Sequence, residues 1–202
     1  MSLPAPYQRS CLGFSTAAFL VVMATVSCAR ADGTFAQFDL SETTANGVFT
    51  KTVGNISFGI SAVDFADGGR QGLNVLYKLP LSWGIATVKL GPSYGRVKLD
   101  TDANAQTEFG AKVALDRYTP MSFGSVYLLA EMNSVDNAAF VLGQMGLSAP
   151  GMSLEISYGE SDSYSETTFA VSKRISDGPV SLRGGYRFRA EEFFLGVSVN
   201  TF

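Results

Sequence analysis

Apolar and polar residues alternate along most of the chain after residue 54. Between residues 56 and 60, for example, Ile56, Phe58 and Ile60 alternate with Ser57 and Gly59. Successive side chains of a β-strand point to opposite faces, so such a run predicts a strand with one apolar face. The same period of two recurs at residues 73–79, 86–90, 109–115, 126–132, 152–158, 169–171, 182–188 and 193–199. A further run, residues 138–147, is apolar on both faces.

Short turn-forming stretches separate these runs. Examples are Asp67-Gly68-Gly69, Ala149-Pro150-Gly151 and Ser176-Asp177-Gly178-Pro179. Consecutive strands joined by short links pair antiparallel, as in a series of hairpins. No stretch long enough for a stable helix has a period of 3.6 residues, and no low-complexity linker divides the chain. The pattern therefore predicts a single all-β domain, an antiparallel up-and-down meander that closes into a barrel.

The number of strands is constrained by chain length and by closure. Two further candidate strands, around residues 34–40 and 48–52, precede the alternating runs. A closed antiparallel barrel with both termini at one end needs an even number of strands. Residues 32–202 divide into ten units of about 17 residues, each a strand of about 11 residues plus a short link. We predict about ten strands, with eight and twelve as alternatives.

Charged residues of both signs occupy the polar face at mid-strand positions, together with small residues such as Gly59 and Gly110. The outside of a soluble barrel is richer in Lys and Glu and poorer in Gly. A small membrane barrel instead packs small residues and mutually neutralising charges in its lumen. We therefore expect the apolar face to meet lipid and the arginines to face acids in the lumen. The predicted lumen charge network is Lys78, Lys89, Glu108, Lys112, Glu131, Glu155, Arg183 and Arg187.

The composition is compatible with this interpretation. Charged residues make up 16% of the chain, below the roughly 25% of soluble domains, so a large part of the surface has few charges. The 21 glycines and 12% aromatic residues suit strands and tight turns. The formal net charge of −3 gives no indication of nucleic-acid binding.

The first 31 residues have the pattern of a secretory signal peptide. Arg9 precedes an apolar core at residues 17–26, and Ala29-Arg30-Ala31 forms a small-x-small cleavage site. We predict cleavage after Ala31, which leaves residues 32–202 as the barrel domain. A retained N-terminal anchor and a lipid attached to Cys28 are the alternatives.

The chain resembles the small outer-membrane β-barrel proteins of Gram-negative bacteria. The resemblance covers the predicted signal peptide, the alternating strands and the terminal Phe202. It implies an outer-membrane location, contact with outer-membrane lipid, and Phe202 as the signal read by the barrel-insertion machinery. The chain departs from the family pattern at one point. Its last apolar positions, Val197 and Val199, are in phase with Thr201 and not with Phe202, unless the final residues form a bulge.

The sequence contains few groups suited to catalysis. Histidine is absent, which removes Ser-His-Asp and Cys-His arrangements and histidine metal sites. No phosphate-binding loop, dinucleotide fingerprint or CxxC motif is present. The acidic turn from Asp100 to Asn104 lacks the glycine and the later glutamate of a calcium loop. We expect no enzymatic activity, cofactor or metal.

Three functions remain open. The first is a structural or interaction barrel with a largely plugged, charge-paired lumen. The second is a narrow porin-like channel for small solutes. The third is an exported soluble barrel that binds an apolar ligand inside. An outward row formed by Ala139, Val141 and Gly143 is a candidate contact with another membrane protein.

Overall fold

The chain divides into two units, and the description below concerns the second, Ala31–Phe202. The structure is a computed structural model that describes residues 32–81, 84–99, 101 and 104–202. The predicted signal peptide, residues 1–31, lies outside the described residues and stays a prediction. No helix in the described ranges is long and apolar enough to cross a membrane.

Twelve strands and one short 3-10 turn, η3, make up the described part of this unit. Each strand overlaps one of the sequence runs that predicted it. The elements are β1 (Gly33–Leu40), β2 (Ala45–Val53), β3 (Ile56–Phe65), β4 (Gly68–Lys78), β5 (Thr87–Leu99), β6 (Gln106–Met121), β7 (Gly124–Asn133), η3 (Val135–Asn137), β8 (Ala138–Leu147), β9 (Met152–Glu160), β10 (Ser165–Arg174), β11 (Val180–Arg187) and β12 (Glu192–Asn200).

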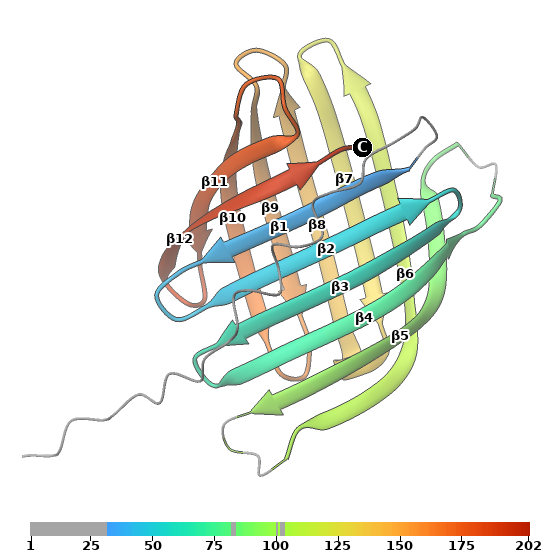
Figure 1. The fold of residues 1–202 in the computed structure, drawn as a ribbon, viewed down its shortest axis with the longest axis vertical. Coiled ribbons are helices and arrows are strands. Elements are labelled where there is room, and N and C mark those ends of the chain that lie inside the picture. The colour runs from blue at the N-terminus through green and yellow to red at the C-terminus, as the bar shows by residue number, and fades with distance from the viewer. Residues whose placement is uncertain (1–31, 82–83, 100, 102–103) are drawn as a thin grey trace, which may run out of the picture. The chain divides into compact units, whose positions relative to one another are not determined.

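The strands form a closed barrel (Figure 1). Each strand pairs antiparallel with its neighbours in sequence, and β1 pairs with β12 to close the ring. Links of a few residues place consecutive strands side by side, because a parallel crossover needs a dozen or more residues. The predicted antiparallel up-and-down meander, closed into a barrel, is confirmed.

The preferred count of ten strands is wrong, because the barrel has twelve. The two candidates around residues 34–40 and 48–52 are both full strands, β1 and β2. Their alternation is weak in the sequence because the faces are mixed. Phe35 lies on the inward face of β1, whereas Gly47 and Lys51 lie on the outward face of β2. Only the pairing of β1 with both β2 and β12 settles that they belong to the ring.

The barrel has two ends. Asp32 and Phe202 lie at one of them, which we call the terminal end, together with the links that follow the even-numbered strands. The opposite end, which we call the distal end, contains the links that follow the odd-numbered strands. The distal links that the structure describes in full span residues 41–44, 66–67, 134–137, 161–164 and 188–191.

The two faces of the wall differ in polarity, and the apolar face is on the outside. In β3, Phe58 and Ile60 are exposed, whereas Ser57 and Gly59 are buried. The most exposed apolar side chains include Phe109 at 86%, Phe193 at 80% and Leu195 at 77%. Among the described residues, eleven buried residues are polar or charged and five are hydrophobic. This distribution is the reverse of a soluble protein's, in which charged residues are almost never fully buried.

The end of β12 is regular. Its pairing with β1 continues without a bulge from Leu195, opposite Leu40, to Asn200, opposite Phe35. Thr201 continues the ladder by donating its backbone N–H to the carbonyl of Thr34 at 3.0 Å. Thr201 therefore keeps the phase of the outward row, and Phe202, the next residue, is out of phase with it, with a side chain that is 67% exposed. The bulge that would restore its phase is not present.

Candidate functional site

The eight charged residues of the predicted network all occupy inward-facing positions of the barrel wall. The strand register establishes this, because each pairs with a residue that is itself inward. Lys78 lies opposite Lys89, Glu131 opposite Ala114, and Glu155 opposite Ala170. Within the described chain they do not form one continuous network. They divide into separate clusters, each completed by residues outside the predicted set.

Arg183 of β11 is the centre of the most deeply buried cluster. Its Nε donates to Asp39 of β1 at 2.9 Å, and its Nη2 pairs with Glu155 of β9 at 3.1 Å. Gln144 donates to the other oxygen of Glu155 at 3.2 Å, and Gln37 donates to Asp39 at 2.8 Å. All three charged residues are at most 6% exposed. Arg183 therefore joins strands two steps away on either side of β11, along the wall of the barrel.

Phe194 of β12 is an apolar member of this inward face. Its ring lies under two guanidinium groups, 5.6 Å from Arg183 and 5.1 Å from Arg187. This geometry allows a cation–π interaction with both. Gly185 lies opposite Phe194 in the register, and a Cβ there would press against the ring at 2.7 Å. A Cβ there would also overlap the backbone carbonyl oxygen of Phe169, so both the neighbouring strand and the aromatic ring require glycine at this inward position.

A second group of inward charges lines the wall formed by β5, β6 and β7. Lys112 pairs with Glu131 at 2.8 Å, and Lys89 pairs with Asp116 at 2.8 Å. Lys78 is exposed and has no ion pair within the part of the chain that the structure describes. Both pairs join directly neighbouring strands. They do not cross the lumen.

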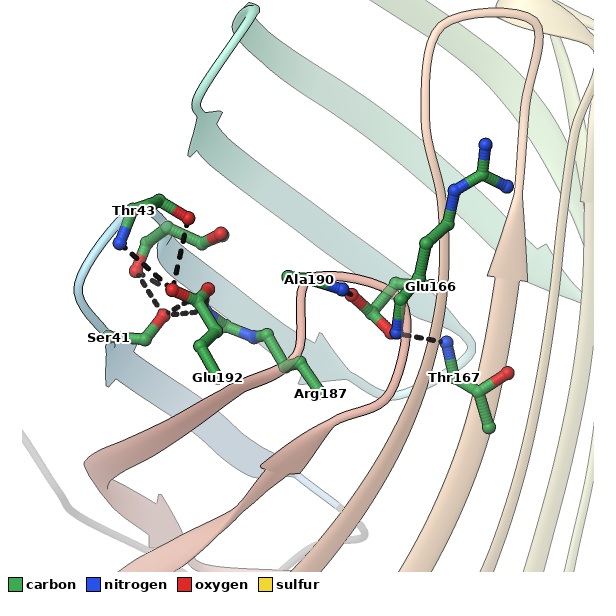
Figure 2. Close-up of polar contacts among 9 residues, drawn as sticks. Ser41, Thr43, Glu166, Thr167, Arg187, Ala190 and Glu192 are labelled. Atoms are coloured by element: carbon green, nitrogen blue, oxygen red, sulfur yellow. Dashed lines mark hydrogen bonds and ion pairs between the residues drawn. The ribbon is translucent and has the colours of Figure 1, made fainter.

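Glu192 ties the first distal link to the last hairpin (Figure 2). One of its oxygens accepts the hydroxyl of Ser41 at 2.6 Å and pairs with Arg187 at 3.3 Å. The other accepts the backbone N–H of Thr43 at 2.9 Å. Arg187 also donates to Ser41 and to the carbonyl of Thr44. These bonds cross the β1–β12 seam and hold the closed ring together at its distal end.

Glu166 of β10 secures the distal link 188–191, between β11 and β12, in a similar way, as Figure 2 shows. It is 5% exposed, and its carboxylate accepts the backbone N–H groups of Thr167, Arg189 and Ala190 at 2.8, 2.8 and 3.0 Å. Two of these donors belong to the link 188–191. A buried carboxylate satisfied by three backbone donors favours a fixed loop conformation.

The short turn η3 packs against the inner wall at the distal mouth. Val135 is 2% exposed, and a Cβ on Gly95 of β5 would overlap one of its methyl groups. Arg70 of β4 pairs with Asp136 at 3.3 Å and donates to the carbonyl of Val135 at 3.2 Å. The Asp136 N–H donates to Glu108 at 2.9 Å. Glu108 therefore contacts the mouth segment and neither of the arginines it was expected to face.

The same turn also contacts the opposite side of the mouth. Asp136 accepts the hydroxyl of Ser163 at 2.5 Å, and its carbonyl accepts the N–H of Asp162 at 3.0 Å. Ser163 and Asp162 belong to the link between β9 and β10. Segment 134–137 is thus bonded to β4 on one side and to the link 161–164 on the other.

A pair of aromatic rings spans the distal mouth. The rings of Phe65, at the end of β3, and Tyr164, in the link between β9 and β10, have centroids 5.0 Å apart. In the order of the ring, β3 and β9 are diametrically opposite. Burial, reinforced by the nearby Glu166 carboxylate, raises the pKa of Tyr164 to about 12 from an ordinary value of 10.0. The phenol is therefore neutral in this contact at physiological pH.

Several charged residues of these clusters are absent from the sequence prediction. Asp116 and Glu192 have the same parity as Lys112 and Phe194, so a strict period-two count finds them. Asp39 could be found only if β1 is assigned as a strand. Asp136 lies in a turn, and no pattern in the sequence places it in the barrel mouth. The missed residues are Asp39, Arg70, Asp116, Asp136, Glu166 and Glu192.

The described part of the chain contains no group of three or more carboxylate, cysteine or histidine side chains that could hold a metal ion. Most of the inward charges instead neutralise one another in ion pairs. What this arrangement can do chemically is stabilise a polar interior and present charges to water or to a passing solute.

No protein-family model matches the chain, and no curated protein matches it. Among solved structures, the chain is similar to a KdgM porin in complex with disordered oligogalacturonate. The sequence identity is 10%, the match covers 83% of this chain and 98% of that one, and the TM-score is 0.46. It is also similar to a substituted porin of Rhodopseudomonas blastica, at 14% identity, with 79% of this chain and 56% of that one covered and a TM-score of 0.38. The functional proposal therefore rests on the geometry of this chain itself.

Proposed function

We propose that the chain is an integral outer-membrane β-barrel with a non-catalytic role. The single observation that carries this proposal is an uncharged outward band around the described strands. If water surrounded the barrel, this outward face would expose many large apolar side chains to it, among them Phe109, Ile156 and Leu195. Lipid is the solvent that such a face suits.

The outward charges of the described strands support this proposal by their position. Each lies within the last five residues of a strand, and none lies in the middle of the wall. A charge at the bilayer centre is costly, whereas long side chains near its edges reach the headgroups. At the terminal end these residues are Lys51, Arg117 and Lys173, and at the distal end they are Asp64, Arg96, Lys98 and Glu160.

Within this proposal, the distal mouth is closed and the role is structural or interactive. Support comes from segment 134–137, which is bonded to both sides of the mouth, and from the Phe65–Tyr164 contact between opposite sides of the ring. The lumen below is lined by paired charges, of which Arg183 with Asp39 and Glu155 form the most buried set.

A narrow channel is the second candidate, because a specific observation favours it. The mid-barrel ion pairs, such as Lys112 with Glu131, lie along the wall and do not cross the lumen. Several inward residues, among them Ser61, Lys78 and Glu108, are exposed. Twelve strands also enclose a wider interior than the eight that side chains just fill. The third candidate, a soluble barrel around an apolar ligand, conflicts with the polar inner face.

The proposal is tested by fractionating cells that produce the full chain and by electrophoresis with and without boiling. Retention in the outer membrane after an alkaline wash, with a mobility shift on heating, is the expected result. Release by the wash without a heat shift would overturn it. Conductance in planar bilayers then separates the two candidates, since a closed mouth predicts no steady current and a channel predicts one.

A further inference from the structure

A groove of about 750 Å³ crosses the outward face of β6, β7, β8 and β9. Two neighbouring rows of outward residues line it, and both rows follow the hydrogen-bond register across the strands. Each row contains one small residue between larger ones, and these two small residues form the floor. The rows are Arg117, Leu128, Gly143 and Ile156, and Leu115, Ala130, Val141 and Tyr158.

The floor of the groove is not required by the packing of the chain. A Cβ on Gly143 would lie 3.7 Å from Leu128 and 3.9 Å from Ile156, which are ordinary contact distances. By contrast, a Cβ on the inward Gly185 or Gly196 would overlap neighbouring atoms. The chain therefore needs those two glycines for its own fold, whereas Gly143 leaves outward space that a larger residue could fill.

Arg117 lies at the terminal-end side of the groove. It is an exposed outward residue, and it donates to the carbonyl of Ile85 at 2.9 Å and to the hydroxyl of Thr119 at 3.3 Å. Neither partner is charged, and no ion pair to Arg117 occurs among the described residues. Both bonds use Nη1 and Nε, so the Nη2 donors face none of the hydrogen-bond acceptors of the described chain. An uncompensated guanidinium beside an apolar groove suits an anion with an apolar tail.

The groove runs in a direction that such a molecule could follow. It extends from Arg117, close to the terminal end of β6, to Thr167, close to the distal end of β10. A tail that begins at Arg117 would therefore pass from the rim of the wall toward its middle. This is the direction of an acyl chain whose phosphate lies at the membrane interface.

We propose that this groove binds one acyl chain of a phospholipid from the leaflet at the terminal end, with its phosphate on Arg117. The inference rests on the proposed membrane location. In this arrangement Leu128 and Ile156 flank the acyl chain, and Ala130 and Gly143 lie beneath the acyl chain. The planar guanidinium can donate to two phosphate oxygens at once, which favours a phosphate over a choline or an ammonium group.

The test uses the full-length protein refolded into vesicles of phosphatidylethanolamine and phosphatidylglycerol, extracted in mild detergent and examined by native mass spectrometry. The variants are Arg117→Gln, which removes the charge, and Gly143→Leu, which fills the groove. Lys51→Gln is the matched control for charge, because Lys51 is also outward at the terminal end. Gly184→Leu is the matched control for size, because Gly184 is outward on β11 and a Cβ there would meet only the flexible end of Leu195 at 3.3 Å and a carbonyl at 3.5 Å.

The wild type and both controls are expected to retain one phospholipid. Arg117→Gln and Gly143→Leu are each expected to retain at least about tenfold less phospholipid. A tenfold loss corresponds to about 1.4 kcal/mol, which is within reach of one charge-assisted contact. In Gly143→Leu the loss follows because the new side chain fills the groove. Equal retention by all five proteins would overturn the proposal, and so would a similar loss in Lys51→Gln. A second protein copy on the groove, seen as a dimer mass that Gly143→Leu abolishes, would also overturn it. A heat-shift assay on the wild type and on each variant comes first. If the wild type does not insert into vesicles, the result counts against the membrane location and not against the groove. Only variants that insert as the wild type does are compared for lipid retention.

Discussion

Arg183 illustrates how single residues hold this barrel together. It is 5% exposed, and it bonds to Asp39 and Glu155, which are themselves buried. A buried ion pair adds little net stability compared with an apolar replacement, but removing one partner leaves a charge without compensation. Here one arginine compensates two carboxylates, so its loss leaves two of them buried.

We predict that Arg183→Gln lowers the free energy of unfolding by about 3–5 kcal/mol. The measurement is the urea midpoint of the heat-shift transition in vesicles. Arg189→Gln is the control, because Arg189 lies exposed in the link 188–191 and its loss should change the midpoint by no more than about 0.5 kcal/mol. Equal midpoints for the two variants would mean that water already compensates the carboxylates.

Tyr164 offers a prediction about pH at the residue scale. Burial raises the pKa of its phenol to about 12 in the folded chain, above the ordinary 10.0. A raised pKa means that the folded state favours the neutral phenol. The contribution of the Phe65–Tyr164 contact is therefore complete below pH 10 and is lost as the pH rises toward 12. In the ultraviolet difference spectrum between the wild type and Tyr164→Phe, the tyrosinate signal should appear near pH 12. A signal near pH 10 would show that the ring is solvated.

At the scale of elements, the position of η3 depends on glycines in the strands it covers. Val135 fits against Gly95 of β5, where a Cβ would overlap it, and a Cβ on Gly110 of β6 would overlap Ser134. Glycine is tolerated there because each strand is held by two neighbours. The inward glycines of β5 and β6 thus make room for the turn that follows β7.

We predict that Gly95→Val displaces segment 134–137 from the mouth. The expected result is faster proteolysis at this segment in the folded, vesicle-bound protein, and a conductance in planar bilayers that the wild type lacks. Gly159→Val is the matched control, because Gly159 is also inward and a Cβ there would meet only Phe140 at 3.4 Å. Unchanged cleavage of Gly95→Val would mean that the bonds of Asp136 hold the segment without Val135.

At the scale of the whole molecule, the decisive property is which face of the wall is apolar. A closed barrel has one inside and one outside, and period-two alternation assigns every strand residue to one of them. In the described residues most inward charges are in ion pairs, and outward charges lie only near the rims. The polar interior needs neutral pairs because its charges have little access to water, and the exterior needs an apolar band if lipid surrounds it.

Neighbouring residues on opposite faces test this assignment. Ile60 is outward at the middle of β3, and Ser61, next to it, is inward. We predict that Ile60→Arg lowers the stability of the inserted barrel by about 2–4 kcal/mol, because it places a charge near the bilayer midplane. Ser61→Arg should cost much less, since this position is an exposed site of the inner face. The measurement is the fraction that folds into vesicles as urea is diluted, and the reverse order of the two variants would place lipid on the other face.

Four features of this fold could be predicted from the residue pattern: the all-β class, the antiparallel order, the closed ring and the assignment of inner and outer faces. Side-chain parity and short links act within a few residues, so they separate the two faces of each strand and give the antiparallel order. The mid-strand charges and glycines of the polar face then indicated that Lys112 lies inward and Leu195 outward.

The strand count, the partners of the charges and the contacts of segment 134–137 across the distal mouth follow from the assembled ring. β1 and β2 have weak alternation, and their membership of the ring depends on β12, at the other end of the chain. Arg187 pairs with Glu192 and not with a more distant acid, because the register of β11 with β12 places them opposite each other. Asp136 reaches Arg70 and Ser163 through a turn whose path depends on several strands at once. Such contacts depend on register and on the curvature of the closed sheet, and these are properties of the assembled ring that no local pattern contains.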